Sequence, residues 1–228
     1  MISPRTLPEI AMPEHPPSAI LYLATGCPHC PVVLQGLSDL VKQGKLGTLE
    51  VVNIQARPDL AQQAGIRSVP WFTIGPFELE GLHSPAELKE WVALAHRPDA
   101  VSEYLARRLR EGQLAKAEAY LRRHPEAMPA LLDLLEKEEA ELPERLGVNA
   151  LMEALEGSPR LASLLDRLIA LSNSPDARIR GDATWFLALT HDARARPAIE
   201  ARLQDDNPDV REVAEDALER LQRPPAGS

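Results

Sequence analysis

Residues 19–30 read Ala-Ile-Leu-Tyr-Leu-Ala-Thr-Gly-Cys-Pro-His-Cys, and this stretch decides the fold of the first part of the chain. Its opening run is nearly all apolar, as expected for a short strand that is covered on both faces. Two cysteines follow at once, Cys27 and Cys30. Beyond them, apolar residues recur at helical spacing as far as Gly44. The stretch therefore predicts a strand that is followed directly by a Cys-x-x-Cys window, and that window is expected to open a helix.

The chain up to residue 98 continues to alternate strand-like and helix-like patterns. A second strand, a short helix, the two arms of a hairpin and a capped last helix are predicted at residues 49–54, 59–64, 71–74, 77–80 and from Ser84 onward. The order β-α-β-α-β-β-α begins with a parallel pair joined by a crossover helix and ends with a hairpin. We expect an α/β domain with a mixed four-stranded sheet flanked by helices.

From residue 100 onward the sequence shows only helical periodicity, broken at short intervals by Gly, Pro and Asp-Asn clusters. Four residues recur 31 positions later in the same order: Ile179, Arg180, Ala183 and Leu187 return as Val210, Arg211, Ala214 and Leu218. Two helices per unit at this period are typical of an α-solenoid. We expect the two repeated arginines to be structural, each pairing with an acid of a neighbouring repeat.

The segment 145–222 resembles the HEAT-like repeats of bacterial proteins. It shares with them the Asp-Pro-like turns, the Ile-Arg or Val-Arg helix start and the Ala-Leu core stripe. The resemblance implies an all-α repeat architecture, and the same architecture carries many functions. We expect its role here to be partner binding, because stacked repeats offer an extended surface without a catalytic group.

Composition changes near residue 98, which places a domain boundary there. Residues 1–98 carry a net charge of −2 and residues 99–228 a net charge of −7. The predicted parts are a Pro-rich flexible tail, a mixed α/β domain, a helical repeat domain and a short C-terminal tail, over residues 1–17, 18–97, 100–223 and 224–228.

Charge and hydropathy exclude several classes of function. The net charge of −9 argues against a nucleic-acid partner, since phosphate neutralisation needs clustered Lys and Arg. No apolar run is long enough to predict a membrane span, and no secretory signal is visible at the N-terminus. We expect a cytoplasmic protein, or a periplasmic one if the sequence is a processed form. No cofactor is expected, and the oligomeric state stays open.

The Cys-Pro-His-Cys window carries the predicted chemistry. Thiol–disulfide exchange needs an exposed thiolate and a second thiol that can displace the captured partner. A helix N-terminus offers free N–H groups and partial positive charge, which lower the pKa of a nearby cysteine. We therefore expect Cys27 to attack and Cys30 to resolve the mixed disulfide. Pro28 and His29, between them, are expected to tune the thiolate.

A second candidate site is Val69-Pro70-Trp71, just before the predicted hairpin. Proline at the start of a strand cannot donate to the ladder. If its peptide bond is cis, the turn brings the Val69 backbone beside the Cys-x-x-Cys loop, where it can hold an incoming polypeptide in strand-like fashion. Trp71 is expected either to contact the substrate or to belong to the core.

Residues 18–96 resemble the thioredoxin-like superfamily, and the run Cys-Pro-His-Cys-Pro resembles glutaredoxin-like protein disulfide oxidoreductases. The resemblance implies that Cys27 is the nucleophile, Cys30 the resolving thiol and Pro70 a cis-proline. One departure concerns Leu21, which occupies the place of an aspartate that many thioredoxins bury six residues before the nucleophile. Proton transfer during resolution then depends on water or on another group.

These patterns predict a thiol–disulfide oxidoreductase that exchanges disulfides with a protein client. Two alternatives remain: a redox-responsive interaction scaffold without general turnover, and a dedicated electron donor to one enzyme such as a peroxidase. The cysteine pair as half of a metal site is a further interpretation, but no other cysteine is present to complete it and we expect no metal. The direction of electron flow, the client and the upstream partner are not determined by the sequence.

Overall fold

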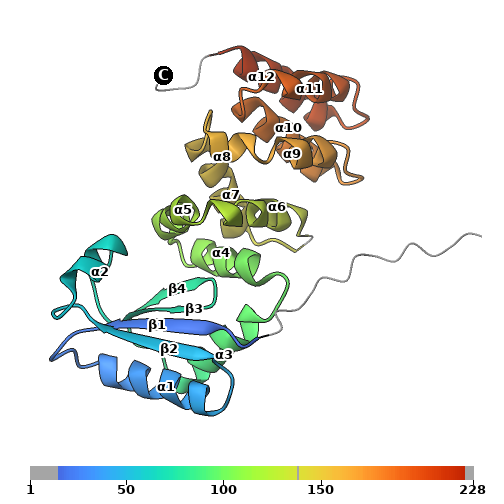
Figure 1. The fold of residues 1–228 in the computed structure, drawn as a ribbon. Coiled ribbons are helices and arrows are strands. Elements are labelled where there is room, and N and C mark those ends of the chain that lie inside the picture. Colours follow the sequence, from blue (N-terminus) through green and yellow to red (C-terminus); the bar gives the residue numbers. More distant parts are fainter. Residues whose placement is uncertain (1–14, 138, 224–228) are drawn as a thin grey trace, which may run out of the picture. The chain divides into compact units, whose positions relative to one another are not determined.

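The structure is a computed structural model that describes residues 15–137 and 139–223. The predicted C-terminal tail and the predicted N-terminal tail up to residue 14 lie outside the described residues. The described residues form two compact units, and the division falls between Val101 and Ser102. Figure 1 shows the elements of both units in chain order.

The first unit is built on one mixed sheet of four strands in the order β2-β1-β3-β4. β1 is parallel to β2 and antiparallel to β3, and β3 and β4 form the hairpin. The elements are β1 (Ser18–Leu23), α1 (Cys30–Lys42), β2 (Thr48–Asn53), α2 (Pro58–Gln63), β3 (Trp71–Ile74), β4 (Phe77–Glu80) and α3 (Pro85–Ala95). This is the predicted order, and the α/β fold with a mixed four-stranded sheet is confirmed.

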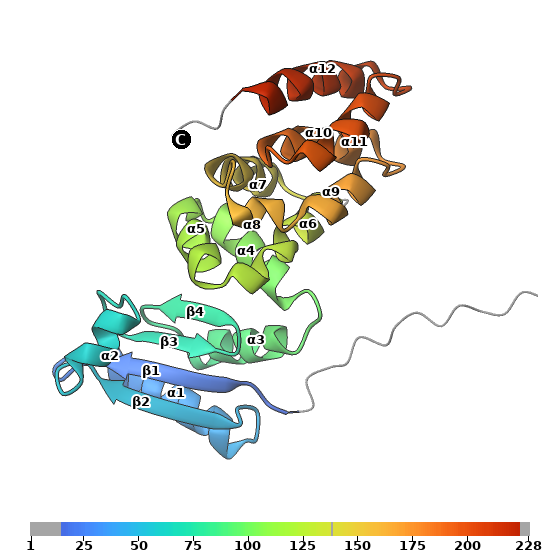
Figure 2. The same cartoon turned by 45° about the horizontal axis from the view of Figure 1, so that its top comes forward.

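Helices α1 and α3 pack against each other and against the strands (Figures 1 and 2). The two helices approach closely at Gly36, where an added Cβ would lie 2.5 Å from Leu88 Cδ1. Because Gly36 and Leu88 are both buried, this seam belongs to the core. The expected cap of α3 is also present, since the Ser84 hydroxyl accepts a hydrogen bond from the Glu87 N–H and the Glu87 carboxylate accepts one from the Ser84 N–H.

The covering of β1 differs from the prediction of a strand buried on both faces. Ala19 and Leu21 are fully buried, whereas Ile20 and Tyr22, on the opposite face, are only partly buried. An apolar run by itself does not tell which face is sealed, because strand side chains alternate and each face is covered separately. The core of this unit therefore lies on the Ala19 and Leu21 face.

In the described part of the second unit, every regular element is a helix (Figure 1). The α-helices are α4 (Ala100–Arg110), α5 (Leu114–Arg123), α6 (Pro129–Glu136), α7 (Leu142–Ala154), α8 (Pro159–Ala162), α9 (Leu165–Leu171), α10 (Ala177–Leu189), α11 (Arg196–Arg202) and α12 (Pro208–Gln222). Two 3₁₀ turns, η1 (Pro125–Ala127) and η2 (Ala193–Ala195), lie among them. None of the helices in the described part of the chain combines the length and the apolar character that a bilayer crossing needs.

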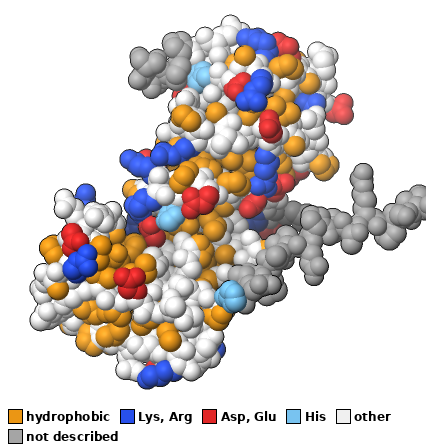
Figure 3. All heavy atoms as spheres, in the orientation of Figure 1, with side chains coloured by type: hydrophobic (Ala, Val, Ile, Leu, Met, Phe, Trp, Pro, Cys, Tyr) orange, Lys and Arg blue, Asp and Glu red, His pale blue; other side chains and the backbone are white. Residues whose placement is uncertain are grey.

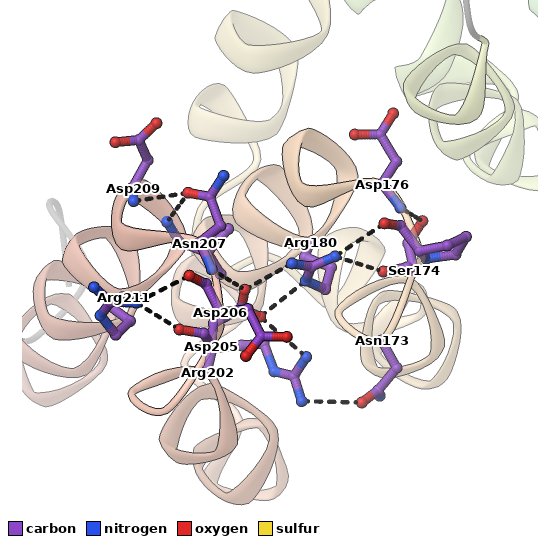
Figure 4. A network of polar contacts seen from close by, with 12 residues as sticks. Asn173, Ser174, Asp176, Arg180, Arg202, Asp205, Asp206, Asn207, Asp209 and Arg211 are labelled. Atoms are coloured by element: carbon purple, nitrogen blue, oxygen red, sulfur yellow. Dashed lines mark hydrogen bonds and ion pairs between the residues drawn. The ribbon is translucent and has the colours of Figure 1, made fainter.

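The predicted 31-residue period is present as repeated contacts at the starts of α10 and α12. The Arg180 guanidinium donates to the carbonyls of Ser174 and Pro175, at 3.0 and 3.1 Å. Its counterpart Arg211 donates to the two carbonyls at the equivalent positions, those of Asp205 and Asp206, at 2.7 and 3.3 Å. Each arginine therefore fastens the loop that precedes its own helix, as Figure 4 shows.

The two repeats are tied together through Asp205, which is almost fully buried. Arg180 donates to both oxygens of its carboxylate, at 2.8 and 2.6 Å. The hydrogen bonds from Arg180 lower the pKa of Asp205 to about 2. The expectation that Arg180 pairs with an acid of a neighbouring repeat is confirmed; Arg211 instead binds backbone carbonyls.

Candidate active site around Cys27 and Cys30

The cysteine pair lies in the loop that connects β1 to α1. The chain leaves β1 and turns at Gly26, whose φ of +82° is favourable only for glycine. The Cys27 N–H then donates to the Ala24 carbonyl at 3.3 Å, which closes the turn. Cys27 and Cys30 form a disulfide across a Cα–Cα distance of 5.5 Å, which is within the usual range for disulfides.

Cys27 precedes the helix, because α1 begins only at Cys30. The expectation that the whole Cys-x-x-Cys window opens the helix is therefore refined: His29 occupies the N-cap position, and only Cys30 lies in the first turn. In this geometry the Cys30 N–H donates to Cys27 Sγ at 3.2 Å. The first turn of α1 contains no acidic residue. Both features favour negative charge on the Cys27 sulfur.

The two cysteines differ in exposure. Cys30 is 4% exposed, whereas Cys27 is only partly buried. Pro28 and His29, between them, are exposed. A partner that approaches from solvent therefore meets Cys27 first, and Cys30 lies behind it within reach of the same sulfur.

Strand pairing brings Val69 and Pro70 to the cysteine loop. β1 and β3 are antiparallel with Tyr22 opposite Trp71, so the residues before Trp71 must lie beside the residues after β1. The peptide bond between Val69 and Pro70 is cis, as the resemblance implied. The Val69 carbonyl oxygen lies 3.8 Å from Cys27 Sγ. These groups, 42 residues apart in the chain, form one site.

Trp71 follows Pro70 directly and packs against Tyr22 next to this site. Its ring meets the Tyr22 ring edge to face, with centroids 5.6 Å apart, and the residue is partly buried. Pro70, by contrast, is buried. Trp71 is thus neither a full core residue nor a free surface one. Figure 3 shows apolar side chains at the surface of this unit, interrupted by a few charged ones.

The structure adds a polar bridge that the sequence analysis missed. The Asn53 amide donates to the Thr25 hydroxyl at 3.4 Å, and the Gln55 side-chain oxygen accepts from the Thr25 N–H at 3.3 Å. Thr25 follows β1 and the two amides follow or end β2, so the bridge joins the carboxyl ends of the parallel pair. The available signal was that these ends meet at one sheet edge. The bridge holds the loop that carries Cys27.

His29 and Leu21 are two positions at which a group that could tune the cysteines or accept a proton was considered. Among the described residues, the His29 ring has no hydrogen-bond partner, so its tuning role stays a prediction. Leu21 is fully buried, and no acid occupies its place in β1. Across the described residues, no group of three His, Cys, Asp or Glu side chains is arranged as a metal site would require.

A strand, a Cys-x-x-Cys loop before a helix, and a cis-proline opposite the sulfurs are now all in place. Residues 19–93 match the family model of the thioredoxin domain. The first unit is therefore a thioredoxin-like domain, followed by an all-helical region. No curated protein matches the chain.

Within the thioredoxin-like domain, the match covers every element from β1 to most of α3, including the cysteine pair and Pro70. It leaves the helical unit outside. The close cysteine pair in this fold is consistent with thiol–disulfide redox chemistry.

Proposed function

We propose that the protein is a thiol–disulfide oxidoreductase that exchanges disulfides with a protein client through Cys27 and Cys30. The observation that carries the proposal is the hydrogen bond from the Cys30 N–H to Sγ of Cys27, which is the more exposed residue of the pair. A hydrogen bond from a helix N-terminus stabilises a thiolate more than a thiol. Because the thiolate is the attacking species, this arrangement favours Cys27 as nucleophile.

The proposed exchange proceeds in two steps. The Cys27 thiolate attacks one sulfur of a client disulfide, forms a mixed disulfide and releases the other client sulfur as a thiolate. The Cys30 thiolate then attacks Cys27 Sγ, which gives the Cys27–Cys30 disulfide and frees the second client thiol. The client gains two electrons and two protons, and the cysteine pair loses them. The same steps in reverse oxidise a client dithiol, and a second dithiol of any source regenerates the reduced pair.

The rate of the second step depends on how readily Cys30 loses its proton. Cys30 must lose its proton before it attacks, and it is buried behind Cys27. The position that holds a buried acid in many thioredoxins is the buried Leu21 in this domain. Water that enters beside Cys27, or the exposed His29 ring, is the proposed acceptor.

Client docking is proposed at the Val69 backbone. The Val69 carbonyl oxygen lies 3.8 Å from Cys27 Sγ. At this distance an extended client segment can pair with the Val69 backbone while the client's own sulfur reaches Cys27. The partly buried Trp71 provides adjacent apolar contact area. The helical repeats are the proposed surface for the rest of the client. Because both cysteines belong to the motif, the proposed compartment is the cytoplasm, where structural disulfides are rare.

Turnover of a model protein disulfide, with dithiothreitol as the terminal reductant, tests this function. Cys27→Ser is expected to reduce turnover to the background rate. Cys30→Ser is expected to lower turnover strongly as well and, in a single-turnover reaction without dithiothreitol, to accumulate a mixed disulfide on Cys27. An active Cys27→Ser variant, or an adduct on Cys30 of the unaltered chain, would contradict the assignment.

A further inference from the structure

A groove of about 580 Å³ lies in the helical unit between α10 and α12, which occupy equivalent positions in successive repeats. It combines small or apolar side chains, one tryptophan and charged or polar side chains from both helices. The lining residues are Ala177, Arg178, Gly181, Asp182, Trp185, Asn207, Asp209, Val210, Val213 and Asp216. On α10 they recur at helical spacing, so one face of the helix supplies them.

The groove is open because Gly181, within α10, has no side chain to fill it. Gly181 has no side chain, and a Cβ added there would lie 3.9 Å from Val210 Cγ2, at ordinary contact distance. Trp185, one turn further along α10, is only partly buried. Its counterpart one repeat later is Asp216 rather than an aromatic residue, so no second ring covers it. The result is an apolar floor and an indole surface that are open to a ligand.

Two unpaired carboxylates line the α12 side of the groove. Asp209 and Asp216 are exposed, and neither forms an ion pair with any residue in the described part of the chain. Figure 4 shows the Asp209 carboxylate pointing away from the polar network of the repeat loops. Burial raises the pKa of Asp182, which lies deeper in the groove, because its charged form is desolvated there.

The single cation of the lining is already engaged. Arg178 donates to the Leu135 carbonyl at 3.1 Å and lies 3.4 Å from the Asp176 carboxylate. Its distance to Asp182 is 3.9 Å. The groove therefore presents more negative charge than it neutralises, next to apolar surface.

We propose that this groove binds a segment of a partner protein that carries basic side chains on both sides of an apolar one. The apolar side chain would lie on Val213 and the Trp185 ring, which are partly exposed, above the buried Val210. Lys or Arg side chains would reach Asp209 and Asp216, and a guanidinium can also stack on the indole. This inference rests on the proposed function in one respect, because it takes the bound partner to be the redox client. It adds the surface that would bind this client and the chemistry of the client segment.

Charge argues against other occupants. The helical region, residues 99–228, has a net charge of −7, so a second copy of this chain would bring like charge to the groove. A nucleic acid would bring phosphates to the same carboxylates. A basic segment is the ligand that complements both the carboxylates and the apolar floor.

Binding of a labelled peptide to the full chain tests the proposal. The probe is a fluorescein-labelled peptide of four Leu-Lys-Lys triplets, which has no cysteine, with Leu-Glu-Glu and Ser-Lys-Lys peptides as comparisons. Fluorescence anisotropy is expected to show binding of the Leu-Lys-Lys peptide, weaker binding of Ser-Lys-Lys and none of Leu-Glu-Glu.

Two substitutions remove the groove's features one at a time, each with a matched control. The double variant Asp209→Asn/Asp216→Asn is expected to weaken binding roughly five- to tenfold, in line with two exposed ion pairs. Glu212→Gln/Glu215→Gln removes the same charge from exposed positions of α12 outside the groove and should change binding less than about twofold. Gly181→Leu fills the groove and should abolish binding, whereas Gly181→Ala should preserve it.

Equal weakening by the two double variants would overturn the proposal, since binding would then follow net charge alone. Unchanged binding by a folded Gly181→Leu variant would do the same, and if that variant fails to fold, the two double variants still decide. A dimer of the unaltered chain that Gly181→Leu dissociates would make a second copy the occupant and overturn it too. Disulfide turnover without peptide binding would refute this inference alone, and peptide binding without turnover would refute only the proposed function.

Discussion

The two units of this protein position their important residues in opposite ways. In the thioredoxin-like domain, Cys27 meets Val69 across 42 residues of sequence because two antiparallel strands place them side by side. In the helical unit, Arg180 and Arg211 each bind carbonyls only five and six residues away, and the same contacts return after one repeat. The first unit therefore contains one site that occurs once. In the second unit the contacts recur, and its distinctive features lie at the positions where the two repeats have different residues.

The largest difference between the units should appear when the tie between repeats is removed. Asp205→Ala leaves the largely buried Arg180 guanidinium without its carboxylate, and breaking such a pair costs about 3 kcal/mol. We expect the urea midpoint of the helical unit to fall accordingly while the reactivity of Cys27 is unchanged. Asp206→Ala, at the exposed neighbouring position, should cost less than about 0.5 kcal/mol. Equal effects of the two variants would show that the Arg180–Asp205 pair does not link the repeats.

Replacing a helical glycine by alanine should change stability in opposite directions in the two units. Glycine inside a helix ordinarily costs about 0.5–1 kcal/mol relative to alanine. Gly181→Ala in α10 meets only an ordinary contact, so we expect it to stabilise by about that amount. Gly36→Ala in α1 places a methyl group 2.5 Å from Leu88 Cδ1, and the overpacking should destabilise by about 1–3 kcal/mol.

Thermal unfolding of Gly36→Ala and Gly181→Ala beside the unaltered chain checks this prediction. A Gly36→Ala variant as stable as Gly181→Ala would mean that the seam between α1 and α3 is loose, and the contrast between a closely packed sheet domain and a more open repeat would fail.

The smallest expected effect is a dependence of stability on pH that belongs to the helical unit. Arg180 holds the pKa of Asp205 at about 2, below its ordinary 3.8. A carboxyl whose pKa is lowered by folding stabilises the fold above the unfolded pKa, and that contribution is lost as the pH falls through the folded one. We expect about 1–2 kcal/mol to disappear between about pH 4 and pH 2.

Urea unfolding at several acidic pH values, followed for the unaltered chain and Asp205→Asn, measures this contribution. The difference between the two proteins should shrink as the pH falls, since asparagine has no proton to gain. A difference that stays constant down to about pH 2 would refute the role assigned to Asp205.

The sequence predicted what depends on local pattern. The hairpin strands Trp71–Ile74 and Phe77–Glu80 have their expected bounds, and the Ser84 capping box is present. The repeat was visible because equivalent positions recur at a fixed interval. In each case the determining residues lie within a few positions or one repeat of one another.

The sequence did not predict what depends on how distant elements meet. The Thr25–Gln55 bridge forms only because two parallel strands end at one sheet edge, and an exposed polar residue carries no mark of its partner. The start of α1 at Cys30, rather than at Cys27, depends on the turn at Gly26. The groove near Gly181 was missed because periodicity shows which residues repeat, whereas the groove arises where Trp185 and Asp216 differ.

Cys27 is assigned as the reactive cysteine of the pair, and selective alkylation measures its reactivity directly. The reduced chain is treated briefly with iodoacetamide at a pH about two units below the ordinary thiol pKa of about 8.5, and the label is located by mass spectrometry. We predict that Cys27 carries the label and Cys30 does not, because only Cys27 is both accessible and hydrogen-bonded by the Cys30 N–H. Label on Cys30, or equally slow labelling of both cysteines, would contradict the account.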